Sequence, residues 1–319
     1  MSRPVSGLTL ALGGGGARGF AHVGVLEALH ARGLPVEAIV GTSSGAIAGA
    51  GYALGYSPQQ MRERVLKFTR SALASDPRVK ALVSQGEESV CASLGDRVGR
   101  IFCQGRMVKS LLLGSSVFEP RFMRDMINFF LPDVPIESTV IPFAAVATDV
   151  QSGETVVIDQ GSLRQAVLAS SSVPGVAPLV EYQGRLLMDG GVAALVPSLE
   201  ARHRGARRLL AVCVDREIGS EETPRQAREL YMRAGDIQGA LLSRLVQREA
   251  DLVVHPAVGA IHWMDFAKAP LIMDLGREAT LRLLPEIALL LHDGWRRRLA
   301  RAWRAGRLAL EDGARREQA

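Results

Sequence analysis

The sequence has few cysteines and no long apolar run, and both absences limit what the chain can be. Its 319 residues contain three cysteines, an odd number without CxxC spacing, so neither a disulfide framework nor a zinc site is expected. This usage is typical of a reducing compartment and predicts a cytoplasmic protein. No apolar stretch approaches the ~18–20 residues that span a bilayer, and the apolar run near the start is too short for a signal peptide.

Acidic residues are outnumbered by basic ones, and the formal net charge is +5. A mild positive charge favours anionic surfaces without singling out nucleic acid, so no nucleic-acid partner is predicted. The excess is concentrated in residues 293–310, which hold six arginines and one acid. Residues 293–319 are therefore interpreted as a basic C-terminal helix and tail. Its tryptophans and leucines share one helical face, which indicates either contact with the anionic inner membrane face or packing onto the domain.

Short apolar runs alternate with helical patterns, and this order predicts an α/β fold with a mainly parallel sheet covered by helices. Residues 57–131 interrupt the pattern with amphipathic helical pieces, which indicates a helical insertion. A closing helix is expected over 275–291, broken or kinked near Pro285. The expected strands are 8–13, 36–40, 143–148, 155–158, 186–188, 209–214 and 252–254.

A serine lies in a glycine-flanked turn between an expected strand and a helix. The run Gly41-Thr42-Ser43-Ser44-Gly45 fits the G-x-S-x-G nucleophile elbow. Side chains at Gly41 and Gly45 would collide where strand and helix approach closely. The elbow would present the serine at the N-terminus of the next helix, where the helix dipole favours negative charge. The central position makes Ser43 the nucleophile candidate, with Ser44 as its competitor.

The first strand runs into a row of glycines with two functional interpretations. The spacing Gly14-x-Gly16-x-x-Gly19 satisfies a dinucleotide-binding fingerprint, which also needs an acidic residue near the end of the second strand. Here Glu37 lies at the beginning of that strand, and no Lys-Ser/Thr pair completes a phosphate loop. The remaining interpretation is an oxyanion hole of backbone N–H groups. Its candidate residues are Gly14, Gly15, Gly16 and Arg18.

A serine nucleophile needs a base, and two candidates remain open from the residues alone. His255 ends an expected strand and is the best placed of the six histidines for a triad. Asp189 leaves another expected strand and enters a turn with Gly190 and Gly191, which would present its carboxylate as Ser43 is presented. A direct serine–aspartate pair would need no imidazole.

At these residues the chain resembles the patatin-like phospholipase family, bacterial branch. Three blocks match in order, at residues 14–19, 41–45 and 189–191, and the stretches 147–149 and 169–175 also look like family signatures. The family often has an asparagine and then a proline after the Asp-Gly-Gly turn. Here the run Ala193-Ala194-Leu195-Val196-Pro197 keeps only the proline.

The resemblance implies a three-layer α/β/α fold and hydrolysis of phospholipid, lysophospholipid or neutral-lipid esters. It implies Ser43 as nucleophile, Asp189 as general base, an oxyanion hole from the first glycine loop, and no metal or organic cofactor. The acyl hydrolase domain is expected over 1–292, with 57–131 as a lid or part of the acyl-chain site. Two alternatives are a transacylase with the same residues and a non-catalytic lipid-binding protein.

Overall fold

The computed structural model describes residues 7–84, 116–215 and 227–292, whose strands form one eight-stranded sheet. The strand order is β5-β6-β3-β2-β1-β7-β8, and β4 also pairs with β3. Strands β1, β2, β3, β7 and β8 are parallel, whereas β4, β5 and β6 are antiparallel to their neighbours. The bounds are β1 Leu8–Leu12, β2 Val36–Thr42, β3 Phe143–Asp149, β4 Thr155–Ile158, β5 Val180–Tyr182, β6 Arg185–Asp189, β7 Leu209–Val212 and β8 Leu252–Val254.

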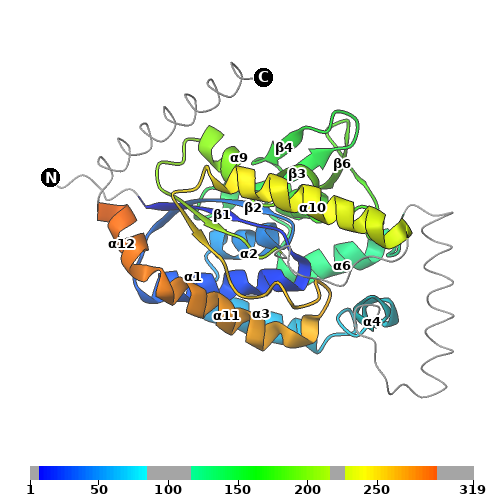
Figure 1. The fold of residues 1–319 in the computed structure, drawn as a ribbon, viewed down its shortest axis with the longest axis horizontal. Coiled ribbons are helices and arrows are strands. Elements are labelled where there is room, and N and C mark those ends of the chain that lie inside the picture. Colours follow the sequence, from blue (N-terminus) through cyan, green and yellow to red (C-terminus); the bar gives the residue numbers. More distant parts are fainter. Residues whose placement is uncertain (1–6, 85–115, 216–226, 293–319) are drawn as a thin grey trace.

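Helices cover both faces of this sheet (Figure 1). One layer holds α1 (Ala21–Ala31), α2 (Ser44–Ala53), α3 (Pro58–Thr69), α6 (Pro120–Phe130), α7 (Leu163–Ser170) and α11 (Ala269–Arg282). The other holds α8 (Gly191–Ala194), α9 (Ser198–His203) and α10 (Ala227–Gln247). The remaining helices are α4 (Pro77–Ser84), α12 (Leu284–His292) and the short 3-10 turns Gly16–Phe20, Ile136–Ser138 and Phe266–Lys268. The predicted mainly parallel sheet between two helical layers is confirmed.

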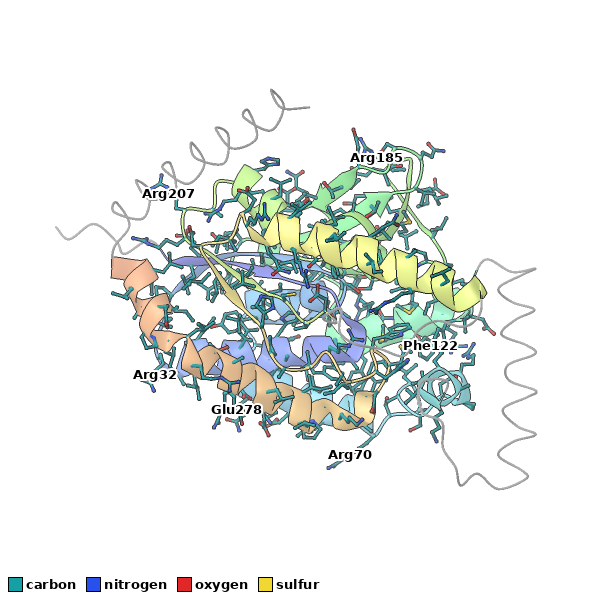
Figure 2. The ribbon with its side chains drawn as sticks, in the orientation of Figure 1. Arg32, Arg70, Phe122, Arg185, Arg207 and Glu278 are labelled. Carbon is teal, nitrogen blue, oxygen red and sulfur yellow. The ribbon has the colours of Figure 1, made fainter. Side chains whose placement is uncertain are left out.

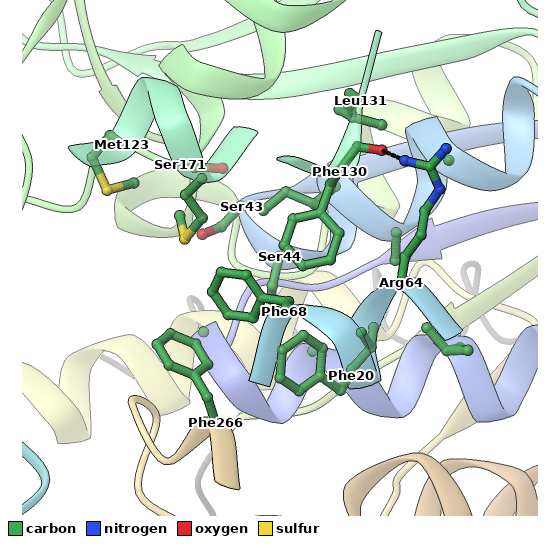
Figure 3. A pocket seen from close by; sticks show the side chains of 18 of the residues that line it. Phe20, Ser43, Ser44, Arg64, Phe68, Met123, Phe130, Leu131, Ser171 and Phe266 are labelled. Carbon is green, nitrogen blue, oxygen red and sulfur yellow. Dashed lines mark hydrogen bonds between the residues drawn. The ribbon is translucent and has the colours of Figure 1, made fainter. Parts of the chain in front are cut away.

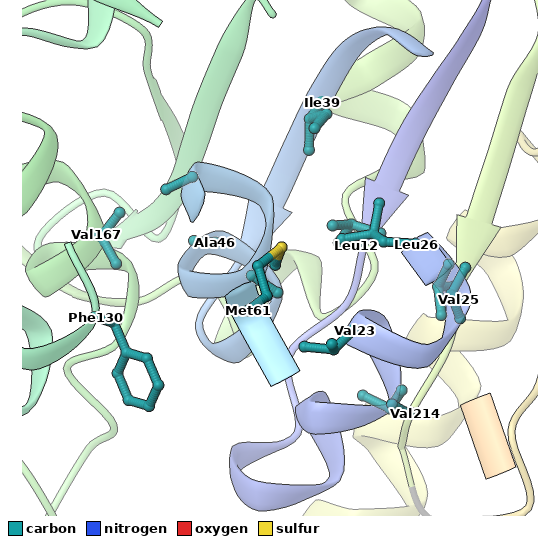
Figure 4. Close-up of a cluster of buried hydrophobic side chains, with 14 of the residues drawn as sticks. Leu12, Val23, Val25, Leu26, Ile39, Ala46, Met61, Phe130, Val167 and Val214 are labelled. Atoms are coloured by element: carbon teal, nitrogen blue, oxygen red, sulfur yellow. The ribbon is translucent and has the colours of Figure 1, made fainter. Parts of the chain in front are cut away.

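Strand β1 shows how the sequence separates the two faces. Its Leu8, Leu10 and Leu12 side chains join the larger core with α1, α2 and α11. The intervening Ala11 belongs to a smaller core under α8 and α9. The alternation follows from the two-residue period of a strand. Figure 4 shows Leu12 and Ile39 of the sheet beside Ala46 and Leu26 of the covering helices.

Strand β6 lies end to end with β2 on the same edge of β3. The register pairs Thr42 of β2 with Val146 of β3, and Asp189 of β6 with the next residue, Ala147. Strand β4 pairs with β3 at both Val146 and Ala147, so it occupies the opposite edge at both positions. A strand residue has only two edges, so β2 and β6 must share one. This arrangement places Asp189 directly beyond the end of β2.

The expected elements are largely present, and the closing helix differs in its start. The structure begins it at Ala269 instead of residue 275, with Pro270 in the first turn, where a proline costs no hydrogen bond. Helix α11 ends at Arg282, and α12 begins at Leu284. The predicted break near Pro285 is therefore present. The segment 293–319 lies outside the described residues, and so does 85–115 within the predicted insertion.

The surface of the described chain carries many arginines. Figure 2 shows Arg32, Arg70, Arg185 and Arg207 at the periphery of the molecule, and all four are exposed. None of the helices in the described ranges is both long enough and apolar enough to cross a membrane.

Candidate active site

The turn between β2 and α2 holds Ser43 in a backbone conformation that side chains rarely adopt. Its φ is 52° and its ψ is −120°. A Cβ at Gly41 would lie 2.6 Å from the Ala46 Cα, and a Cβ at Gly45 would overlap the Leu12 carbonyl oxygen. Both flanking glycines are therefore required by the close approach of strand and helix. Strain held by surrounding packing is typical of functional sites.

Helix α7 anchors this turn through Ser170. The Ser43 N–H donates to the Ser170 Oγ at 2.9 Å, and the Ser170 hydroxyl donates to the Val146 carbonyl oxygen at 2.6 Å. Ser170 is fully buried. The end of α7 therefore joins the turn to β3 through two buried hydrogen bonds, which hold the serine backbone in place.

Asp189 ends β6 and enters the turn that the sequence predicted. Its Oδ1 accepts a 2.7 Å hydrogen bond from the Gly191 N–H, while Oδ2 is buried with no hydrogen-bond partner among the described residues. A Cβ at Gly190 would overlap the Val146 carbonyl oxygen, so this turn also needs its glycine. Burial raises the pKa of the Asp189 carboxyl to about 6, and the nearby Ser43 hydroxyl and the Gly191 N–H partly offset this rise. A buried, nearly unpaired carboxylate is a stronger base than an exposed one.

The glycine row is in close contact with Ser43. A Cβ at Gly14 would approach the Ser43 Cβ to 3.2 Å. The Gly14 N–H, however, donates to the Leu195 carbonyl oxygen at 2.9 Å. This N–H is therefore not available to an oxyanion, contrary to the prediction. In the described chain the N–H groups of Gly15 and Gly16 have no such carbonyl partner.

The far end of this row is fixed against the segment around Trp263. Gly16 has a φ of 59°, and a Cβ there would overlap the Trp263 carbonyl oxygen. The Arg18 Nε donates to the Ile261 carbonyl oxygen at 2.7 Å. Arg18 therefore holds the loop in position.

A polar cleft of about 690 Å³ brings the predicted site residues together. Its walls also include residues that sequence reasoning did not single out. Asp215 follows β7, so the logic that identified Asp189 could have found it, whereas His262 and Lys268 lie in or next to irregular chain without a pattern. The predicted residues that line it are Gly14, Gly15, Gly16, Arg18, Ser43, Asp189 and Gly191.

An apolar pocket of about 110 Å³ adjoins the cleft, and Ser43 lines both. Its walls come mainly from α2, α3 and α6, together with the residues around Phe266. Figure 3 shows the rings of Phe20, Phe68 and Phe266 below Ser43. Helices α3 and α6 of the 57–131 segment therefore contribute to this apolar space.

Ser44, the competing nucleophile, points elsewhere. Its Oγ is buried without a hydrogen-bond partner among the described residues, and a Cβ at Gly19 would overlap it. Ser44 lines the apolar pocket but not the cleft that contains Asp189. The geometry therefore favours Ser43 over Ser44.

None of the histidines whose side chains the structure describes has a hydrogen bond to Ser43. His255 is exposed and does not line the cleft. His22 is fully buried, its Nε2 donates to the Gly13 carbonyl oxygen at 2.8 Å, and burial lowers its pKa to about 4. Through this hydrogen bond His22 holds the first residue of the glycine row in place. His262 lines the cleft wall, and its Nδ1 accepts a hydrogen bond from the Met264 N–H at 3.2 Å.

Comparison with known proteins shows the family of this chain. A family model described as patatin-like phospholipase matches residues 10–202, so the chain belongs to the patatin-like phospholipase family. It is 31% identical to an uncharacterised NTE family protein of Mycobacterium tuberculosis, over 68% of this chain and 51% of that protein. It is 30% identical to the lysophospholipase NTE1 of Candida glabrata, over 70% of this chain and 11% of that protein.

The chain thus spans about half the length, or less, of these curated relatives. Among solved structures, VipD from Legionella pneumophila is similar with a TM-score of 0.46 and 16% identity. That match covers 90% of this chain and 67% of VipD.

Proposed function

We propose that the protein hydrolyses carboxylic esters of phospholipids or lysophospholipids, with Ser43 as nucleophile and Asp189 as general base. One observation carries the proposal: Ser43 lies on the border between a polar cleft with a buried carboxylate and an apolar pocket. A lipid ester has the same division, because its carbonyl joins an apolar chain to a polar alcohol. The family membership supports an acyl hydrolase of this kind.

In the proposed reaction, Asp189 takes the Ser43 hydroxyl proton while Oγ attacks the ester carbonyl carbon. The carbonyl oxygen becomes negatively charged and is held by the Gly15 and Gly16 N–H groups. When the tetrahedral intermediate collapses, the carbon–oxygen bond to the alcohol breaks and Asp189 returns its proton to the leaving oxygen. Asp189 then takes a proton from a water molecule, whose oxygen attacks the acyl-enzyme carbonyl carbon. The bond between this carbon and the Ser43 Oγ breaks, Asp189 returns the proton to Oγ, and the fatty acid is released. Each backbone donor of this kind contributes about 10²–10³ to turnover.

The apolar pocket supports a monoacyl lipid as the preferred substrate. One acyl chain would occupy the space between α2, α3 and α6, while the alcohol and head group would occupy the polar cleft. The name of the Candida glabrata relative, lysophospholipase, describes this substrate class for that protein. We expect lysophospholipids to be turned over faster than diacyl phospholipids.

The test combines covalent labelling with product analysis. A fluorophosphonate should label the wild type and the control Ser44→Ala, leave Ser43→Ala unlabelled, and react about 10²–10⁴ times more slowly with Asp189→Asn. Full-rate labelling of Ser43→Ala would reject the nucleophile. Release of fatty acid from lysophospholipid and diacyl phospholipid should then show the monoacyl preference. Faster cleavage of the diacyl substrate would reject the preference and leave the serine assignment standing.

A further inference from the structure

Helix α10 carries its large apolar side chains on the outside of the molecule. Leu230, Ile237, Leu241 and Leu245 are all exposed, Leu241 at 54% and Leu245 at 56%. Spacings of seven, four and four residues place them on one side of a helix with 3.6 residues per turn. A surface helix ordinarily buries such a stripe against the core. Here it is left in solvent, beside α9 (Figure 1).

The opposite side of α10 is small or polar and faces the catalytic cleft. Gly235, Gly239 and Ala240 line the cleft. The buried Ser243 donates to the Asp215 Oδ2 at 2.7 Å, and the Gln247 Nε2 donates to the Ser243 Oγ at 2.8 Å. The helix is therefore held to the carboxyl end of β7 by polar contacts. Its amphipathic pattern is the reverse of that of a helix packed on a core.

Charge around the stripe is basic. Arg244 and Arg248 are exposed near the end of α10. Over residues 227–248 the sequence has four arginines and two acids, and one of the arginines, Arg233, lines the cleft. Aliphatic side chains flanked by arginine are the composition of a helix that lies in the surface of an anionic bilayer. Arginines beside an anionic membrane add electrostatic attraction, and this charge complementarity favours lipid headgroups over a neutral apolar partner.

We infer that α10 is an interfacial helix, which inserts Leu230, Ile237, Leu241 and Leu245 into the surface of an anionic lipid bilayer. Because the other side of the helix lines the cleft, this contact would hold the mouth of the cleft at the bilayer surface. Val192 of α8 is both exposed and part of the cleft wall, and it adds an apolar group there. The advantage of this placement rests on the proposed function, since the ester would reach Ser43 from the membrane. Binding itself does not require catalysis.

The experiment measures vesicle binding and catalysis separately in the full chain. Cosedimentation with phosphatidylglycerol/phosphatidylcholine vesicles is compared for the wild type and the double variant Leu241→Gln/Leu245→Gln. The matched control is Leu271→Gln/Leu289→Gln, on α11 and α12, where the leucines are 51% and 53% exposed. The α10 variant should bind vesicles about tenfold more weakly or worse, and the control should bind as the wild type does.

Hydrolysis of a dissolved short-chain ester should be the same in all three proteins, since none of the four leucines lines the cleft or the pocket. Unchanged vesicle binding by the α10 variant overturns the inference, as does absence of binding by the wild type. Sedimentation equilibrium tests the alternative that a second copy of the chain covers the stripe. If the wild type is a dimer and the α10 variant is a monomer, the stripe is a dimer interface and the lipid proposal is overturned. If circular dichroism shows that the glutamine variant unfolds, Leu241→Ala/Leu245→Ala replaces it with the same criteria. Vesicle binding by Ser43→Ala, which has no activity under the proposed function, keeps this test independent of catalysis.

Discussion

Asp189 illustrates at the scale of one residue how the fold creates chemistry. Its position at the end of β6 removes the carboxyl from water, and only Gly191 and the Ser43 hydroxyl partly compensate the lost hydration. The raised pKa of about 6 places the change of protonation close to neutral pH. A general base is most effective when its pKa lies near the working pH.

The pH profile of catalysis should report this carboxyl. The base must be ionised, so kcat/KM for a dissolved ester should be small below pH 5, rise through a midpoint near the Asp189 pKa of about 6, and level off above it. The control His255→Ala should keep the profile and most of the activity, because His255 is exposed and lies outside the cleft. A midpoint that moves or disappears in His255→Ala would instead favour the imidazole.

The same pKa predicts a gain of stability in Asp189→Asn. The folded pKa of about 6 exceeds the unfolded value of 3.8, so the folded state holds the proton more tightly. The contribution of Asp189 to the free energy of unfolding should therefore be most favourable below pH 3.8 and should fall as pH rises to about 6. The ionised form costs on the order of 3 kcal/mol above pH 6, which the amide avoids.

Urea unfolding of the wild type and Asp189→Asn at pH 4 and pH 8 measures this cost. The advantage of the variant should be on the order of 2–3 kcal/mol larger at pH 8. Comparing one variant at two pH values cancels the fixed cost of the substitution. Equal differences at both pH values would show that burial does not perturb this carboxyl.

At the scale of elements, the end of α7 determines the position of the serine turn. Ser170→Ala would remove the acceptor of the buried Ser43 N–H and one donor to the Val146 carbonyl oxygen. We expect a loss of about 1–3 kcal/mol in stability, and kcat lower by about tenfold or more, since misplacement of a nucleophile is costly.

Ser172→Ala is the matched control for this element. Ser172 is also buried at the end of α7, but its hydroxyl donates to the Leu168 carbonyl oxygen within its own chain segment. Its variant should keep kcat near the wild-type value. If the two variants lose kcat equally, the contact with the serine turn has no special role.

The elements that sequence patterns did not predict have identifiable physical reasons. Strand β5 has only three residues and joins β6 through Gln183 and Gly184, both with positive φ. A glutamine in that conformation gives no turn signal of the Asn-Gly kind. Helix α10 was not predicted, and two glycines, Gly235 and Gly239, interrupt its sequence pattern. The strands with continuous buried runs were predicted because burial on both faces requires such runs.

At the scale of the whole molecule, the pocket and the cleft divide the proposed substrate between two layers of structure. Met126 on α6 lines the apolar pocket and is only partly buried, so a larger side chain can be accommodated there. Met126→Trp should reduce the space for an acyl chain. We expect kcat/KM for dodecanoyl esters to fall about tenfold or more relative to butanoyl esters. An unchanged ratio of the two substrates would place the acyl chain elsewhere.

The candidate site was predictable from the sequence where backbone constraints leave a local pattern. Ser43 follows β2, Asp189 ends β6, and both precede glycines that close packing requires; these patterns can be recognised without a structure. Partners that meet only through tertiary contacts were not predictable. The Leu195 carbonyl that engages the Gly14 N–H belongs to a distant segment, and Ser170 gave no sign that it supports the turn.

The end-to-end placement of β2 and β6 along β3 has a consequence for how this protein tolerates change. The proposed nucleophile and base lie at strand ends that pair with consecutive residues of one central strand, Val146 and Ala147, so a single peptide repeat sets their separation. Their separation does not depend on the length of chain that connects them in the sequence. Insertions in the Gln183–Gly184 hairpin, or a circular permutation opened there, should leave that spacing intact, whereas a one-residue register slip of β3 would abolish it.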